Sequence, residues 1–398
     1  MRTLQTLCLV LACLALSLSA FASGQPLVTF DQIAKLTAPD GAANDAFGNA
    51  VAIDGNTIVV GKADGTIQSA FVYENNSGTV TQVAELTPSD GVAGDRFGYS
   101  VAISGSVIVV AALEHVNLDP KNFGSLYVYV EPAGGWTSMT ETAELTLAQA
   151  GAELGRSIGT TGNEVVAVNF NNGSVVVWNQ PSGGWVSSSK PNAELLTGSP
   201  GSNLLNVAIS GNVIVAGCPN AFLYGSTFLY VKPASGWNKI GITPTARLVG
   251  SGDAGGGGQA VAINGNTVVS STGASLFVFV KPSSGWANMN QTATLTDANA
   301  QNDLFAVAVS GGTVVVGDSA QLVGVNPNQG AAFVFLKPSG GWKNLTTANA
   351  ELTANDGNIG DNLGTSVAVS GGTVVAGAPF AQIGSNVAQG AAYVFAEQ

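Results

Sequence analysis

The sequence predicts an all-β fold built from repeats, and three observations lead to this class. A turn glycine recurs at spacings of 46 to 60 residues, at Gly55, Gly105, Gly162, Gly211, Gly265, Gly311 and Gly371. Each copy contains four short β-type runs, and no stretch shows a sustained apolar period of 3.6 residues. Four strands per copy, repeated seven times, predict a seven-bladed β-propeller of four-stranded antiparallel blades.

The four runs of a copy follow one another in a fixed order. A VAI or VAV segment and a TVVVG-like segment come first, and a Gly-containing turn typical of a tight hairpin joins them. The third run is aromatic and β-branched, as in Phe71-Val72-Tyr73. The fourth is an AELT segment, usually reached through a KPSGGW-like corner in which Pro and Gly shape the turn.

The two ends of the chain predict how the ring closes. The last copy stops at its third run, Tyr393-Val394-Phe395, and no AELT segment follows it. A spare segment of that type, Ile33-Ala34-Lys35-Leu36-Thr37, precedes the first copy. Because an unpaired strand edge is costly, we expect this N-terminal strand to complete the seventh blade.

Residues 1–22 have the pattern of a secretory signal peptide, and residues 23–398 form the propeller. Arg2 precedes an apolar run from Leu7 to Leu18, and cleavage is expected between Ala22 and Ser23. The run is too short for a membrane span, and no later segment reaches 18 apolar residues. A lipoprotein signal ending at Cys13 is the alternative. The mature chain is therefore expected to be secreted or at the cell surface, without a membrane span.

Composition excludes several kinds of protein. The 398 residues include 13 basic and 25 acidic side chains, and the net charge of −12 argues against nucleic-acid binding. The chain has one histidine, His115, which excludes a His-rich metal centre. Once Cys8 and Cys13 leave with the signal, only Cys218 remains, so no internal disulfide can form.

Two short motifs resemble those of a known family. The first motif is Phe47-Gly48, Phe97-Gly98 and the degenerate Leu363-Gly364, and the second, which follows it, is Gly377-Ala378-Pro379 and Gly217-Cys218-Pro219. This pattern resembles the FG-GAP repeats of integrin α-subunits and of secreted bacterial proteins. The resemblance implies a seven-bladed propeller with a role in extracellular recognition or adhesion more often than in catalysis.

The calcium loops of that family are not expected here. Integrin-type blades often carry an Asp-x-Asp/Asn-x-Asp/Asn-Gly loop between their first two strands. Here that connection has shrunk to turns such as DGNT and SGGT, of which only the first, with Asp54, carries a carboxylate. Because calcium takes six to eight oxygen ligands, these turns predict no metal site.

Acidic pairs recur in the loop that leads from the fourth strand of one blade into the next blade. We expect the second member of each pair, together with His115, to line a ligand-binding face: Asp45, Asp95, His115, Asp303 and Asp361. The alternative is that these Asp residues only hold the shape of their Asp-Gly turns, and that His115 is a solvated loop residue rather than an acid or base.

Two further features have structural and functional interpretations. Tryptophans recur at the KPSGGW-like corner, at Trp136, Trp185, Trp237, Trp286 and Trp342. They are either platforms for stacking sugars or, as the repetition favours, covers for the hydrophobic ends and gaps of the blades. Cys218 is interpreted as a small core residue rather than a nucleophile.

Together these features predict a secreted, non-enzymatic module for binding or adhesion that recognises an extracellular protein or a carbohydrate. It is expected to be a monomer without a cofactor and without catalytic residues. Two alternatives stay open. One is a glycan-active enzyme with a carboxylate pair on the funnel face, since glycosidase chemistry needs only two such groups. The other is a structural module of a surface assembly.

Overall fold

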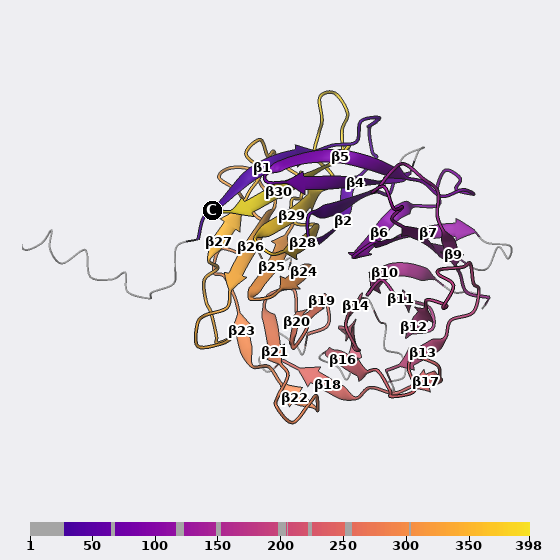
Figure 1. The fold of residues 1–398 in the computed structure, drawn as a ribbon. Helices are drawn as coiled ribbons and strands as arrows, with labels where there is room; N and C mark the ends of the chain where they lie inside the picture. Colours follow the sequence, from indigo (N-terminus) through magenta and orange to yellow (C-terminus); the bar gives the residue numbers. More distant parts are fainter. Residues whose placement is uncertain are drawn as a thin grey trace, which may run out of the picture.

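The computed structural model describes residues 28–64, 68–116, 123–148, 153–197, 204, 206–221, 225–250, 257–301 and 304–398. The described residues form seven β-sheets arranged as blades in a ring (Figure 1), so the predicted propeller is confirmed. No helix in this part of the chain is long and apolar enough to cross a membrane. The expected cleavage site at Ala22 and Ser23 and the candidate Asp303 lie outside the described residues.

Each blade begins with a strand at the centre of the ring and adds later strands toward the rim. Blade 1 consists of β2 (Phe47–Asp54), β3 (Thr57–Lys62), β4 (Ser69–Asn76) and β5 (Thr79–Leu86). Blade 2 consists of β6 (Phe97–Ser104), β7 (Val107–Val116), β8 (Phe123–Val130) and β9 (Ala143–Leu145). Blade 3 consists of β10 (Leu154–Thr160), β11 (Glu164–Asn169), β12 (Ser174–Asn179) and β13 (Ala193–Leu196).

The remaining blades repeat this order. Blade 4 consists of β14 (Asn206–Ser210), β15 (Val213–Cys218), β16 (Ser226–Val231) and β18 (Ala246–Val249), and blade 5 consists of β19 (Val261–Asn264), β20 (Thr267–Ser271), β21 (Leu276–Val280) and β23 (Ala293–Leu295). Blade 6 consists of β24 (Ala306–Ser310), β25 (Thr313–Asp318), β26 (Ala331–Leu336) and β27 (Ala350–Leu352). Blade 7 consists of β28 (Ser366–Ser370), β29 (Thr373–Ala378), β30 (Ala391–Glu397) and the N-terminal strand β1 (Phe30–Leu36).

The ring closes through its N-terminal strand, as predicted. The strand β1 pairs antiparallel with β30, in a register that runs from Phe30 opposite Glu397 to Leu36 opposite Ala392. It therefore takes the outer position that AELT segments hold in the other blades. Residues from the two ends of the chain thus share the core of the closing blade, where Leu36 packs in one cluster with Ala392 and Val394.

The outer edges of the blades carry a feature that the sequence did not predict. Two blades have a fifth strand: β17 (Ile240–Ile242) lies parallel to β13, and β22 (Met289–Asn290) lies parallel to β18. Both extra strands come from the corner of the following blade. Single parallel bridges at the same place, such as Leu86 with Met139, join other neighbouring blades. Each such corner thus covers the open edge of the blade before it, which limits pairing with other chains.

The tight turns between the first two strands of each blade also connect neighbouring blades. The N–H groups of Gly105 and Gly265 donate to Asp54 Oδ2 and Ser210 Oγ of the preceding blade, at 2.7 and 3.0 Å. The one carboxylate of these turns is therefore engaged in a blade-to-blade contact. These turns form one face of the ring, and the loops between fourth and first strands and between second and third strands form the opposite face, which we call the loop face.

Candidate functional site

Blades 1, 2 and 7 share one segment on the loop face, Asp-Gly-x-x-x-Asp, which leads into the first strand of each of these blades. Its second carboxylate turns back and accepts a backbone N–H from the same loop: Ala42 to Asp45 at 2.7 Å, Val92 to Asp95 at 2.8 Å and Asn358 to Asp361 at 2.8 Å. All three carboxylates are buried. The loop-holding role that turn chemistry suggested is therefore what the geometry shows for Asp45, Asp95 and Asp361.

The backbone beside these carboxylates explains why the loop needs such support. The residue after each of them is not glycine and has a positive φ: 53° at Ala46, 57° at Arg96 and 56° at Asn362. Such a conformation is unfavourable for a residue with a Cβ atom, so the surrounding contacts must hold it. The buried carboxylate, by fixing the preceding turn, supplies one of those contacts.

In blade 1 a lysine occupies the space between the two carboxylates of the loop. Lys62 is the last residue of β3, and its side chain is almost completely buried. Its ammonium group lies 2.9 Å from Asp40 Oδ2 and 3.7 Å from Asp45 Oδ2. A buried cation is stable only when paired in this way, so Lys62 and the acidic loop depend on each other.

In blade 2 the equivalent space holds His115, near the end of β7. The sequence alternative of a solvated loop histidine is wrong, because a shift of register after Ala112 prolongs the strand and brings the ring inside. The Nδ1 atom lies 2.8 Å from Asp95 Oδ2, and Nε2 lies 3.6 Å from Asp90 Oδ2. Tyr127 packs edge-on against the imidazole and donates its hydroxyl to Asp90 Oδ1 at 2.9 Å.

In blade 7 the compensating cation comes from the closing strand. Lys35 of β1 and the Tyr393 hydroxyl both donate to Asp356. Burial alone would raise the pKa of Asp356, but these two donors outweigh it and hold this pKa below its usual range. Burial raises the pKa of Asp361, against the opposing effect of backbone N–H donors. The first Asp of this loop is thus stabilised as an anion, whereas the second is not.

The FG and GAP motifs meet between neighbouring blades. Gly98, in the FG pair of blade 2, has a φ of 92°, and its carbonyl oxygen lies where a Cβ on Gly61 of blade 1 would approach within 2.1 Å. The same contact recurs between Gly48 and Gly377, between Gly258 and Gly217, and between Gly364 and Gly317. The motif therefore marks a backbone-to-backbone contact that joins one blade to the next, for which only glycine is small enough.

A family model for the FG-GAP repeat matches residues 30–73, 80–129 and 346–395, which include the closing blade and the first two blades. The chain is an FG-GAP repeat propeller. A sequence comparison with the curated proteins found no significant match.

Solved structures agree with the fold of this FG-GAP repeat propeller. A computationally designed protein, Ika8, is similar over 92% of this chain and 99% of its own, with a TM-score of 0.50 and 15% identity. The WD40 β-propeller domain of Doa1 is similar over 92% of this chain and 97% of its own, with a TM-score of 0.55 and 10% identity. At such low identity these similarities concern the fold alone.

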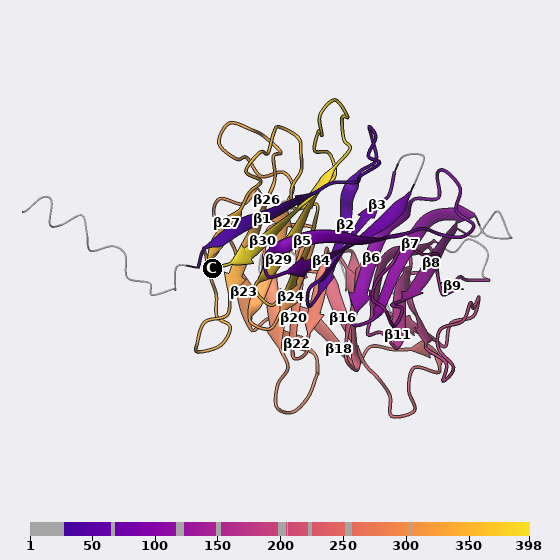
Figure 2. The same cartoon turned by 45° about the horizontal axis from the view of Figure 1, so that its top comes forward.

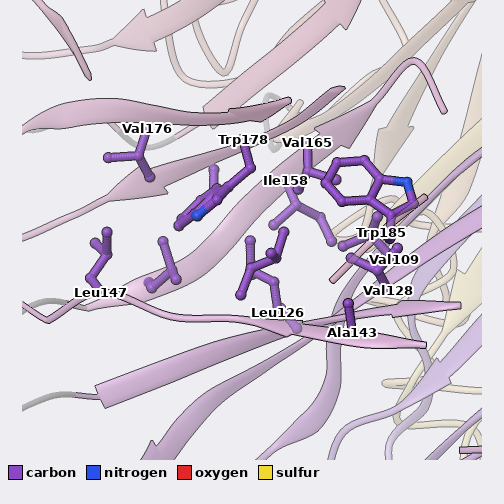
Figure 3. Packing of buried hydrophobic residues seen from close by; sticks show 14 of the residues in the cluster. Val109, Leu126, Val128, Ala143, Leu147, Ile158, Val165, Val176, Trp178 and Trp185 are labelled. Carbon is purple, nitrogen blue, oxygen red and sulfur yellow. The ribbon is translucent and has the colours of Figure 1, made fainter. Parts of the chain in front are cut away.

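The five corner tryptophans of the FG-GAP repeat propeller are buried between blades. Trp185 of blade 3 packs against Val109, Val128 and Ala143 of blade 2 within one cluster (Figure 3). Trp136, Trp237, Trp286 and Trp342 pack in the same way on the blade before their own. They cover the gaps between blades, so they do not offer an exposed ring of stacking platforms. Cys218 is buried in the core as well.

Exposed apolar side chains on the loop face are a feature that the sequence reasoning missed. Val325 is 89% exposed, Ile359 66%, Val387 58% and Phe380 54%. All four lie on loops of blades 6 and 7, which stand beside each other at the top of the ring in Figure 2. Ile359, Phe380 and Val387 line an open groove of about 740 Å³. The sequence signals only the likeness of the two loops that carry Val325 and Val387, AQLVGVNPNQGAA and AQIGSNVAQGAA.

These two loops are held firmly by hydrogen bonds. Asn326 and Asn386 donate side-chain N–H groups to Gln329 and Gln389 at 2.9 and 2.8 Å, and Gln329 and Gln389 are buried. Each loop also bonds to the next acidic loop, through Gly360 N–H to Pro327 O at 3.2 Å and Asn44 N–H to Val387 O at 2.9 Å. The apolar tips are therefore presented on supported loops.

Proposed function

We propose that this propeller is a secreted or cell-surface, non-enzymatic binding module that recognises an extracellular protein through the loops of blades 6 and 7. The observation that carries the proposal is the group of exposed apolar side chains at Val325, Ile359, Phe380 and Val387. Three of them, Ile359, Phe380 and Val387, line one groove, and exposed apolar side chains grouped in this way commonly mark a protein-binding site. We call these four side chains the apolar tips.

Two further properties of the surface favour a protein over a carbohydrate as partner. The apolar tips include three aliphatic side chains, which suit apolar side chains of a protein better than the hydroxyl-rich surface of a sugar. The supported loops reduce the conformational entropy that binding would cost. The tryptophans that could have stacked on sugars are buried elsewhere.

The experiment compares capture of proteins from a surface extract of the source organism by three immobilised chains. The first is the unmodified chain, and the second carries Ile359→Ser and Phe380→Ser. The third is a control with Val186→Ser and Ile240→Ser, residues that are 56% and 58% exposed at the corners on the opposite face. We expect one protein to be retained by the first and third chains and at least tenfold less by the second. Equal retention by all three chains, or binding only on a glycan array, would contradict the proposal.

A further inference from the structure

Three potential metal ligands from separate segments meet in blade 2. Asp90 belongs to the acidic loop, His115 to the end of β7 and Glu144 to β9. One ligand atom from each lies within 4.8 Å of the others. His115 is only 7% exposed, whereas the side chain of Asp90 is 47% exposed, so the group lies at the surface with an open side.

The orientation of the imidazole is set by a second carboxylate. Asp95 is buried and accepts the N–H of Val92 at 2.8 Å, and its Oδ2 also lies 2.8 Å from Nδ1 of His115. Because an ionised carboxylate can only accept, Nδ1 carries the proton of this hydrogen bond. In the neutral ring, the lone pair is then on Nε2, which faces Asp90. Histidine ligands of metals usually donate the N–H of their other nitrogen in this way, to a carboxylate, a backbone carbonyl or a water molecule.

The separation between Nε2 and Asp90 suits a bridging ion better than a direct bond. At 3.6 Å, Nε2 and Asp90 Oδ2 are too far apart for a hydrogen bond. Two ligands about 2.0–2.1 Å from a tetrahedral zinc ion lie about 3.3 Å apart. In blade 1, by contrast, Lys62 reaches both oxygens of Asp40 at 2.9 and 3.0 Å and leaves no such gap.

The two carboxylates of the group are themselves held in place. Tyr127 donates to Asp90 Oδ1 at 2.9 Å, and Ser125 donates to Glu144 Oε1 at 2.8 Å. Such outer hydrogen bonds orient metal ligands and are part of a metal site.

We propose that Asp90, His115 and Glu144 bind a divalent transition-metal ion of the zinc class. Two carboxylates and a neutral imidazole offset the charge of such an ion, and mixed nitrogen and oxygen donors suit zinc. Three protein ligands leave a fourth position for water or for a donor from a partner. This site lies on the loop face, away from the hairpin turns in which no calcium is expected, and it is independent of the binding surface proposed for blades 6 and 7.

Blade 3 offers a matched control for this site. Ser174 donates to Glu194 Oε1 at 2.8 Å, as Ser125 does to Glu144, and the two glutamates hold the same place in the AELT segments of their blades. No histidine accompanies Glu194, because His115 is the single histidine of the chain. Glu194→Gln therefore reproduces the chemical change of Glu144→Gln outside the proposed site.

The test is a zinc titration by calorimetry on the full chain, prepared without a histidine tag and freed of metal with a chelator. We expect one zinc ion to bind the unmodified chain and the Glu194→Gln variant equally. His115→Gln and Glu144→Gln should each weaken binding at least about tenfold, the lower end of what loss of even an outer-shell partner costs. Asp95→Asn should weaken it too, by releasing the ring.

A second measurement does not depend on how the variants fold. Cobalt(II) added to the unmodified chain should give the intense visible absorption of a tetrahedral site, and one equivalent of zinc should remove it. Absence of this spectrum, or equal zinc affinity of the unmodified chain and of folded His115→Gln, would overturn the proposal.

Discussion

Blades 1 and 2 carry the same Asp-Gly-x-x-x-Asp loop, and they differ in the side chain that stands between its two carboxylates. In blade 1 the Lys62 ammonium contacts both Asp40 and Asp45, so the chain supplies its own permanent cation. In blade 2 the Nδ1 atom of His115 makes a hydrogen bond with Asp95, but its Nε2 atom lies 3.6 Å from Asp90 Oδ2, too far for a second one. A repeat thus fixes the backbone, while one side chain decides whether the acidic loop is closed or can accept an ion.

Blade 7 is a third solution to the same problem. Its first carboxylate, Asp356, pairs with Lys35, which stands in β1 where blades 1 and 2 have the glutamates of their AELT segments. The cation therefore arrives with the strand that closes the ring. The following predictions test this comparison, from the largest expected effect to the smallest.

Removing the closing strand should have the largest effect, because blade 7 then loses its outer strand together with Lys35. We expect deletion of residues 23–38 to cause aggregation or a gross loss of stability, since β30 would present an open edge. Thermal unfolding followed by circular dichroism, with light scattering, checks this. A chain lacking only residues 23–27 keeps all of β1 and should melt like the unmodified chain. Normal melting of the longer deletion would refute closure by β1.

Replacing Lys62, the cation of blade 1, should have the next largest effect on stability. Lys62→Met leaves the buried Asp45 without its cation, and breaking a buried ion pair on one side costs about 3 kcal/mol. Urea unfolding measures the loss, with Lys343→Met, at an exposed position, as a control that should change stability little. Unchanged stability of Lys62→Met would mean that the loop does not depend on its cation.

Altering the contact that both blades share should have a smaller effect. Gly98→Ala places a Cβ on a residue with a φ of 92°, and this Cβ lies 2.9 Å from the backbone nitrogen of Lys62. The substitution should therefore lower the free energy of unfolding by about 2 kcal/mol. Gly134→Ala, with no heavy atom within 4 Å of its new Cβ, should be nearly neutral in the same urea experiment. Equal stabilities of the two variants would show that the FG contact between blades is not tight.

The sequence was sufficient for the fold because the fold repeats. The seven glycine turns predict the number of blades, and the spare segment that begins at Ile33 predicts that the N-terminal strand closes the ring. The pairing of β1 with β30 confirms this closure. The strands β17 and β22 were not predicted, because pairs and triplets of residues after a corner show no alternation and pair with another blade.

The candidate site was less accessible to sequence reasoning. The same Asp-Gly turn chemistry serves a carboxylate that faces a ligand and one that turns inward, so burial of Asp45, Asp95 and Asp361 could not be inferred. The position of His115 depends on an irregular register in β7. The apolar tips appear only when loops distant in sequence stand side by side.

The most direct test of the comparison between blades 1 and 2 is nuclear magnetic resonance of the imidazole nitrogens in the untagged chain, where His115 gives the single histidine signal. In the neutral ring, long-range ¹H–¹⁵N correlation should show a proton on Nδ1 and none on Nε2. Addition of one equivalent of zinc should then shift the Nε2 resonance while Nδ1 keeps its proton. Protons on both nitrogens, with no response to zinc, would mean that His115 is a built-in cation like Lys62 and would contradict this account.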